Sequence, residues 1–160
     1  MHYRNLLTPF LLLPALVLAA EAPLYIEADR ATLDDRSGIA IYQHNVQIRH
    51  ADRYLEADKV TLQRRNGDLD TLIAEGTPAR FRHRPQRGEP IEAEALRIEY
   101  FADGERVLLI GEARLIRNGD RFSGDRIDYH IDSEVVRAEG ESGRVRAVIQ
   151  PRSDQGDGTP

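Results

Sequence analysis

The chain has 160 residues, a length that suits a single domain. Its formal net charge of -5 argues against nucleic-acid binding, because nucleic-acid-binding domains concentrate Lys and Arg. The absence of cysteine excludes a disulfide framework, so stability must come from the packing of apolar residues, which make up 41% of the composition.

The N-terminal segment has the pattern of a secretory signal. Arg4 supplies a positive charge, and an apolar stretch over residues 6–20 follows, interrupted by two prolines. Small residues come next, as signal peptidase requires. The sequence therefore predicts a cleaved signal over residues 1–22, with cleavage between Ala19 and Ala22 and export to a bacterial periplasm. An uncleaved anchor is the alternative.

From residue 26 onward a four-residue sequence motif recurs about every 30 residues. Each copy reads apolar, polar, small, acidic, and alternating apolar residues follow it. Alternation with a period of two is typical of β-strands, and repeats of this length indicate one stacked unit. The alternation slips by one residue at each acid, which predicts a bend, with the acid capping nearby backbone amides. Four copies favour this architectural role over a catalytic one: Asp29, Asp58, Glu94 and Asp125.

A second repeat places Gly or Asn between two apolar runs, at Asn45, Gly76, Gly111 and Gly140. These residue types permit a bulge or corner within a sheet. Asn-Gly and Asp-Gly pairs mark tight turns between other runs. Together the runs predict an all-β antiparallel domain of about sixteen short strands over residues 23–150. The polar residues 151–160 are expected to form a disordered tail.

The sequence carries no recognisable catalytic or metal-binding motif. Its five His residues show no metal-ligand spacing, and no cysteine is present to complete a site. Neither a G-x-S-x-G nucleophile motif nor a phosphate-binding Gly-rich loop occurs. We therefore expect no enzymatic activity, no cofactor and no metal.

Every second residue along the predicted strands is apolar, and these residues should face the interior. Such an interior either packs against itself or shelters an apolar ligand, and the residues alone favour the packed core. Its members are Leu24, Ile26, Leu33, Val60, Leu62, Phe81, Ile98, Tyr100, Leu115, Ile127 and Tyr129.

Several segments, taken in order, resemble a known family. They are residues 23–34, 57–60, 76–81, 95–100, 109–113 and 124–129. In their residues and in their order along the chain, these segments are similar to the periplasmic lipopolysaccharide-transport protein family (LptA or OstA-like). The resemblance covers nearly all of residues 23–150.

The resemblance implies an open, twisted β-jellyroll with a hydrophobic groove, and it reverses the preference for a packed core. It also implies a carrier that shields the lipid A acyl chains of lipopolysaccharide during export, in outer membrane biogenesis. Implied partners are a bitopic inner-membrane jellyroll protein of the export ATPase complex, an outer-membrane translocon, and further copies joined head to tail. The groove should then be lined by Leu24, Ile26, Leu33, Leu62, Phe81, Ile98, Tyr100, Leu115, Ile127 and Tyr129.

An open sheet leaves an unpaired strand at each end. We expect these ends to be the first strand, residues 24–28, and the last strand, residues 144–149. Pairing of one end with the other end of the next copy would build an open filament. The residues expected at this joint are Leu24, Tyr25, Ile26, Val145, Ala147 and Ile149.

Three other interpretations stay open at this point. The first is the bitopic inner-membrane partner of the same pathway, which has a similar jellyroll on a membrane anchor. An exported β-solenoid enzyme acting on polysaccharide would need convergent carboxylates in a cleft. A structural periplasmic scaffold would need neither a cleft nor a groove.

Overall fold

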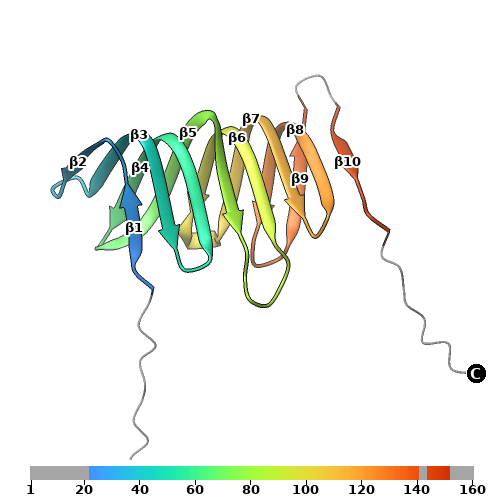
Figure 1. Cartoon of the computed structure of the whole chain (residues 1–160), viewed down its shortest axis with the longest axis horizontal. Coiled ribbons are helices and arrows are strands. Elements are labelled where there is room, and N and C mark those ends of the chain that lie inside the picture. The colour runs from blue at the N-terminus through green and yellow to red at the C-terminus, as the bar shows by residue number, and fades with distance from the viewer. Residues whose placement is uncertain (1–21, 141–143, 152–160) are drawn as a thin grey trace, which may run out of the picture.

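The computed structural model describes residues 22–140 and 144–151. In these residues ten strands form one sheet whose pairings are antiparallel, and most neighbours in the sheet also follow one another in sequence (Figure 1). The elements are β1 (Leu24–Glu27), β2 (Arg30–Asp34), β3 (Ile39–His50), β4 (Arg53–Arg65), β5 (Asp68–His83), β6 (Ile91–Phe101), the 3-10 turn η1 (Ala102–Gly104), β7 (Arg106–Arg117), β8 (Asp120–His130), β9 (Val135–Glu139) and β10 (Arg146–Val148).

Two sequence predictions fall almost entirely outside these residues. The predicted signal up to residue 21 and the predicted tail from residue 152 are not among the described residues. Within the described ranges, no helix has the length and apolar character that a membrane span requires.

The all-β antiparallel class is confirmed, but the expected number of about sixteen strands is wrong. The sheet has ten strands because β3 to β8 are long and continue through a bend that the sequence pattern separates into two strands. Counting these six strands as two segments each, with the four short strands, gives sixteen segments. A β-bulge bends a strand without ending its hydrogen-bonded ladder, and this explains the difference.

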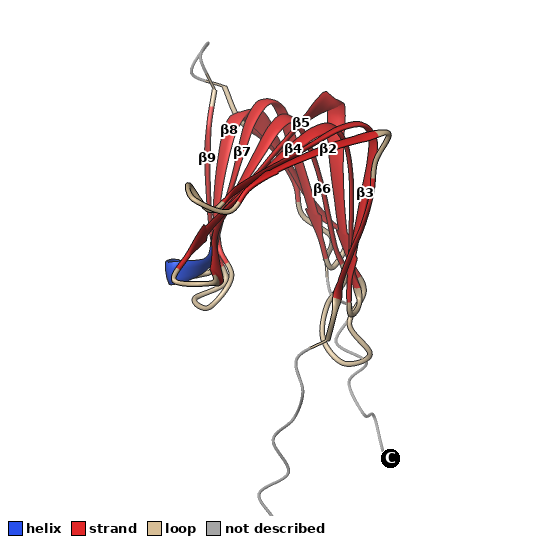
Figure 2. Cartoon of the chain, turned by 90° about the vertical axis from the view of Figure 1, so that its left-hand side faces the viewer, coloured by secondary structure: helices blue, strands red, loops and turns tan. Residues whose placement is uncertain are grey.

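The bends fold the sheet into an arch with two limbs, which Figure 2 shows from one end. We call the half that contains β2 and β9 the β2 limb, and the half that contains β1 and β10 the β1 limb. Each of the strands β3 to β8 runs through both limbs. The concave side of the arch is therefore formed by one face of a single continuous sheet.

The bends lie at the two sequence repeats. Pairing registers shift between Gln43 and Val46, Glu56 and Lys59, Glu75 and Ala79, Glu94 and Arg97, and Ile110 and Ala113. Asn45 (φ 52°) and Gly111 (φ 77°) adopt left-handed backbone there, a conformation that Asn and Gly favour. Gly76 does not adopt it, and a Cβ added there would instead lie 2.8 Å from the backbone nitrogen of Ala79. The repeats thus mark positions where the chain turns from one limb into the other.

Three of the four repeated acids bond to side chains of the neighbouring strand near the bend. The Asp29 carboxylate accepts a hydrogen bond from the Asn45 side-chain amide at 2.8 Å, and Asp58 accepts one from the Thr77 hydroxyl at 3.4 Å. Glu94 accepts a hydrogen bond from Arg80 at 3.2 Å. The role at the bend is as expected, but these partners are side chains and not the backbone amides that the sequence suggested.

The concave and convex faces of the sheet differ in chemistry. All the buried apolar residues except Leu108 form one cluster on the concave face, with Val60, Leu109 and Ile127 at its most buried positions. Ion pairs cross the convex face from strand to strand, such as Arg97 with Glu75 at 2.8 Å and Arg106 with Asp128 at 2.7 Å. The alternation in sequence therefore corresponds to an apolar inside and a charged outside of the arch.

Each end of the sheet is formed by two short strands. β1 and β2 both pair with β3, and β9 and β10 both pair with β8. The expected terminal strands, residues 24–28 and 144–149, correspond to β1 and β10, which are shorter and share their ends with β2 and β9. Val145 and Ile149 flank β10 and do not belong to it.

Candidate functional site

The pairing registers place all ten predicted groove residues on the concave face. Directly paired residues of an antiparallel sheet point to the same side. In the β2 limb one row of paired residues runs Leu33, Ala40, Leu62, Leu72, Tyr100, Val107, Tyr129 and Val136, and the next runs through Ile98, Leu109 and Ile127. In the β1 limb one row runs Ile26, Ile48, Leu55, Phe81, Ala93, Leu115 and Phe122.

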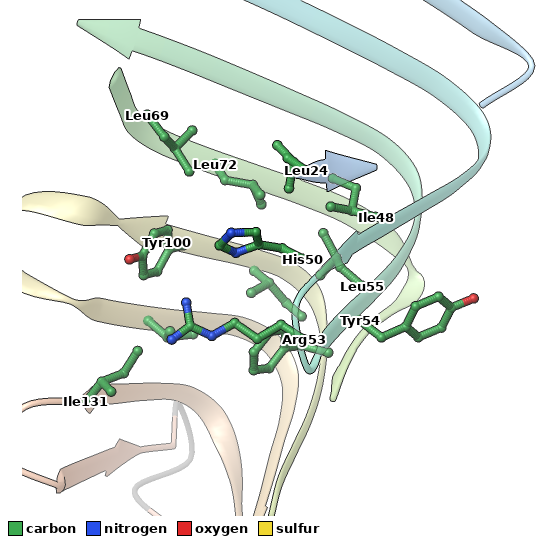
Figure 3. Close-up of a pocket in the computed structure, with 13 residues that line it drawn as sticks. Leu24, Ile48, His50, Arg53, Tyr54, Leu55, Leu69, Leu72, Tyr100 and Ile131 are labelled. Atoms are coloured by element: carbon green, nitrogen blue, oxygen red, sulfur yellow. The ribbon is translucent and has the colours of Figure 1, made fainter. Parts of the chain in front are cut away.

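A cavity of about 170 Å³ opens between the limbs, and its lining is mostly aliphatic and aromatic (Figure 3). Four of the ten predicted groove residues line it: Leu24, Phe81, Ile98 and Tyr100. Sequence reasoning missed the others, which are Ile48, His50, Arg53, Tyr54, Leu55, Leu69, Leu72, Val107 and Ile131. Ile48 and Leu55 share the apolar parity of their strands, so the alternation itself would have indicated them.

The remaining six predicted groove residues lie on the concave face but outside this cavity. Leu62, Leu115, Ile127 and Tyr129 are buried in the apolar cluster, and Ile26 packs against it. Leu33, in contrast, is 60% exposed at the end of the sheet. The concave face thus combines a closely packed part with an open part, where the sequence left a choice between a packed core and a groove.

The cavity is small compared with a lipid. An apolar cavity of about 150 Å³ holds a molecule the size of benzene. The 170 Å³ cavity therefore has room for a small apolar group.

Tyr100 places a hydroxyl group in this apolar lining. Burial raises the pKa of the Tyr100 hydroxyl, Glu105 and Asp132 raise it further, and the positive charge of Arg53 opposes them. The hydroxyl therefore stays neutral at physiological pH. Tyr54 points away from the cavity in Figure 3, and its hydroxyl donates to Glu56 at 2.9 Å.

The chemistry of the cavity is that of a binding site. Its lining contains no carboxylate, and among the described residues no group of three or more His, Asp or Glu is placed to hold a metal. General acid–base catalysis by paired carboxylates has no candidate residues there. The arrangement is suited to holding an apolar group out of water.

The similarity to known proteins is consistent with this geometry. The family model described as LptA/(LptD N-terminal domain) LPS transport protein matches residues 25–135. This range runs from β1 to the start of β9 and includes every cavity-lining residue except Leu24. The chain belongs to the LptA family of lipopolysaccharide transport proteins. The resemblance noted in the sequence is thereby confirmed.

Individual members of the LptA family resemble the chain over most of its length. The lipopolysaccharide export system protein LptH of Pseudomonas aeruginosa is 34% identical over 142 residues, covering 82% of this chain and 81% of that protein. LptA of Escherichia coli K12 is 28% identical over 144 residues, covering 87% and 78%.

A solved structure supports the same fold. The crystal structure of LptH, described as the LptA-homologous periplasmic component of the lipopolysaccharide transport device of Pseudomonas aeruginosa, superposes with a TM-score of 0.75. It is 30% identical and covers 81% of this chain and 96% of that one. The expectation of a non-enzymatic protein agrees with the description of this family as a transport protein.

Proposed function

We propose that the chain is a periplasmic carrier that holds the lipid A acyl chains of lipopolysaccharide between the two limbs of its arch. The observation that supports it most is the cavity, which lies inside the matched region and has an apolar lining without carboxylates. Relatives of the chain are named as lipopolysaccharide export proteins. The acyl chains of lipopolysaccharide are an apolar ligand that suits this cavity.

The energy of exposure explains why such a carrier is needed. Burying one CH₂ group contributes about 0.8 kcal/mol, so exposing an acyl chain of about a dozen carbons to water costs on the order of 10 kcal/mol. A row of sites with similar affinities removes that barrier, because each step exchanges one apolar contact for another. The sequence has no nucleotide-binding motif, so the energy for directional movement would come from a partner ATPase at the inner membrane.

The proposed function is tested by direct binding of lipopolysaccharide to the purified protein. Saturable binding, with protection of a fluorescent acyl chain from aqueous quenchers, is the expected result. The polysaccharide enzyme predicts binding of delipidated polysaccharide instead, and the structural scaffold predicts binding of neither. The membrane-anchored alternative is tested by mass spectrometry of the mature N-terminus, where cleavage near Ala20 is expected.

We further propose that copies join end to end, so that the arch continues from one molecule to the next and reaches the partners at both membranes. The two ends of the sheet carry exposed apolar side chains, including Tyr25 and Leu33 at one end and Val148 and Ile149 at the other. Among the described residues, the terminal strands β1, β2 and β10 have one unpaired edge each. A contact between unlike ends repeats without closing and so produces a filament.

Proline substitutions in β10 test this joint. Consecutive residues of a strand direct their N–H groups to opposite edges, so of Ala147 and Val148 one donates towards β8 and the other away from it. Proline removes the donor at either position. We expect both Ala147→Pro and Val148→Pro to reduce concentration-dependent oligomers in sedimentation, while one of them leaves the melting temperature of the monomer nearly unchanged.

The wild-type protein provides the control in the same sedimentation series. If it remains monomeric when concentrated and shows no pairing with membrane partners, end-to-end joining is wrong and a soluble shuttle is the better model. Val145→Pro, which lies outside β10, should have a smaller effect than the two substitutions within the strand.

A further inference from the structure

Arg53 brings a positive charge to the apolar cavity. It is the first residue of β4, next to the turn at the tip of the β1 limb, and it pairs directly with His50 on β3. Its side chain is half-buried and lines the cavity together with His50. In Figure 3 the Arg53 side chain extends across the cavity towards Tyr100 and Ile131.

Among the described residues, Arg53 has no counter-ion, in contrast to two other arginines of the β1 limb. Arg82 pairs with Glu56 at 3.3 Å, and Arg117, on the same row of the β1 limb, pairs with Glu89 at 3.2 Å. Within residues 22–140 and 144–151, Arg53 makes neither an ion pair nor a side-chain hydrogen bond, and nor does His50. His83, its other direct partner, is already paired with Asp52 at 3.1 Å.

Two carboxylates that influence Tyr100 form no ion pair with Arg53. Glu105 and Asp132 lie close enough to Tyr100 to influence its hydroxyl, as Arg53 does. Neither of them forms an ion pair with Arg53. The cavity therefore has a positively charged lip on the β1 limb, where the Arg53 side chain lies beside His50.

A guanidinium without a counter-ion beside an apolar cavity is suited to one kind of ligand. A charge removed from water is costly unless it is paired. The planar guanidinium donates two parallel hydrogen bonds to a phosphate, and such charge-assisted bonds are stronger than neutral ones. An apolar chain in the cavity would bring an attached anionic group close to this donor.

We propose that Arg53, with His50 beside it, binds a phosphate group of the amphiphile whose acyl chain occupies the cavity. This inference rests on the proposed lipid-carrier function and adds to it a polar subsite and an orientation. Arg53 lies near the tip of its limb, whereas the bend of β4 lies near Asp58. The head group therefore lies at the open side of the arch, and the acyl chain points towards the bend.

Two ligands with the same alkyl chain distinguish binding at the phosphate subsite from binding in the apolar cavity. The binding of dodecyl phosphate and of the neutral dodecyl glucoside is measured below their critical micelle concentrations, and inorganic phosphate is measured alone. We expect the wild-type protein to bind dodecyl phosphate more tightly than either. Arg53→Gln should weaken dodecyl phosphate binding by about tenfold, the loss typical of a charge-assisted hydrogen bond, and leave dodecyl glucoside unchanged.

Two further variants control for charge and position. Arg53→Lys keeps the charge but loses the planar fork, so it should retain part of the preference for phosphate. Arg49→Gln removes an arginine of the convex face, where Arg49 contacts the Tyr54 ring at 5.8 Å, and should change neither affinity. Thermal melts of all variants confirm that they fold.

The outcomes are distinguishable. Equal binding of both dodecyl ligands, unaffected by Arg53→Gln, overturns the subsite and leaves the proposed carrier function intact. Inorganic phosphate that binds as tightly as dodecyl phosphate indicates a simple anion site and overturns the proposed amphiphile. If neither dodecyl ligand binds the folded protein, the groove and the subsite are both refuted.

Discussion

Phe81→Asp is expected to weaken lipopolysaccharide binding by at least about tenfold, because it introduces a carboxylate into an apolar site. Phe81 lines the cavity from the β1 limb and packs against the buried cluster without being fully enclosed. The measurement is a binding titration with purified protein, accompanied by a thermal melt. Ile98→Asp should have the same effect on binding but a larger one on stability, because Ile98 is buried.

Two variants control the Phe81 result. Phe81→Leu keeps an apolar side chain and should bind nearly as well as the wild type. Leu24→Asp places the same charge at a residue that lines the cavity but is 44% exposed, so it should weaken binding with little loss of stability. A folded Phe81→Asp or Leu24→Asp protein with normal affinity for lipopolysaccharide would show that the cavity is not the binding site.

Leu109→Ala is expected to lower the free energy of unfolding by about 2–5 kcal/mol, the usual cost of removing a buried Leu side chain. Leu109 is 0% exposed and lies on a concave-face row between Ile98 and Ile127. Domains of this kind are stable by only about 5–15 kcal/mol, so the loss would be a large fraction of the total.

Urea unfolding measures this effect, and Leu96→Ala provides the matched control. Leu96 lies at the bend of β6 and is exposed, so its truncation should cost less than about 1 kcal/mol. Similar unfolding midpoints for the two variants would contradict the assignment of Leu109 to the buried cluster of the concave face.

The sequence predicts the sheet well because its alternation and its bends are local properties. Asn45 and Gly111 mark bends because the backbone there is left-handed. The repeated four-residue motif that ends in an acid marks the bends of the intervening strands. The strand number was wrong because the same local signal accompanies both a strand end and a bulge. Only the pairing across the bend, which involves distant residues, distinguishes the two.

The location of the cavity could not be predicted from the alternation. Phe81 and Leu115 lie on the same row of the β1 limb, yet Phe81 lines the cavity and Leu115 is buried in the cluster. The difference depends on how closely the opposite limb approaches, which no local pattern records. Arg53 and His50 were missed because they are polar, although Arg53 shares the parity of Leu55 and His50 shares that of Ile48.

Photocrosslinking in living cells tests the central claim most directly. A photoreactive amino acid replaces Phe81 or Tyr100 on the concave face, and Arg82 serves as the control, since its side chain pairs with Glu56 on the convex face. We predict that lipopolysaccharide is captured from positions 81 and 100 and not from position 82. A stable, exported protein that captures no lipopolysaccharide from either inner position, or captures it equally from position 82, would contradict the carrier.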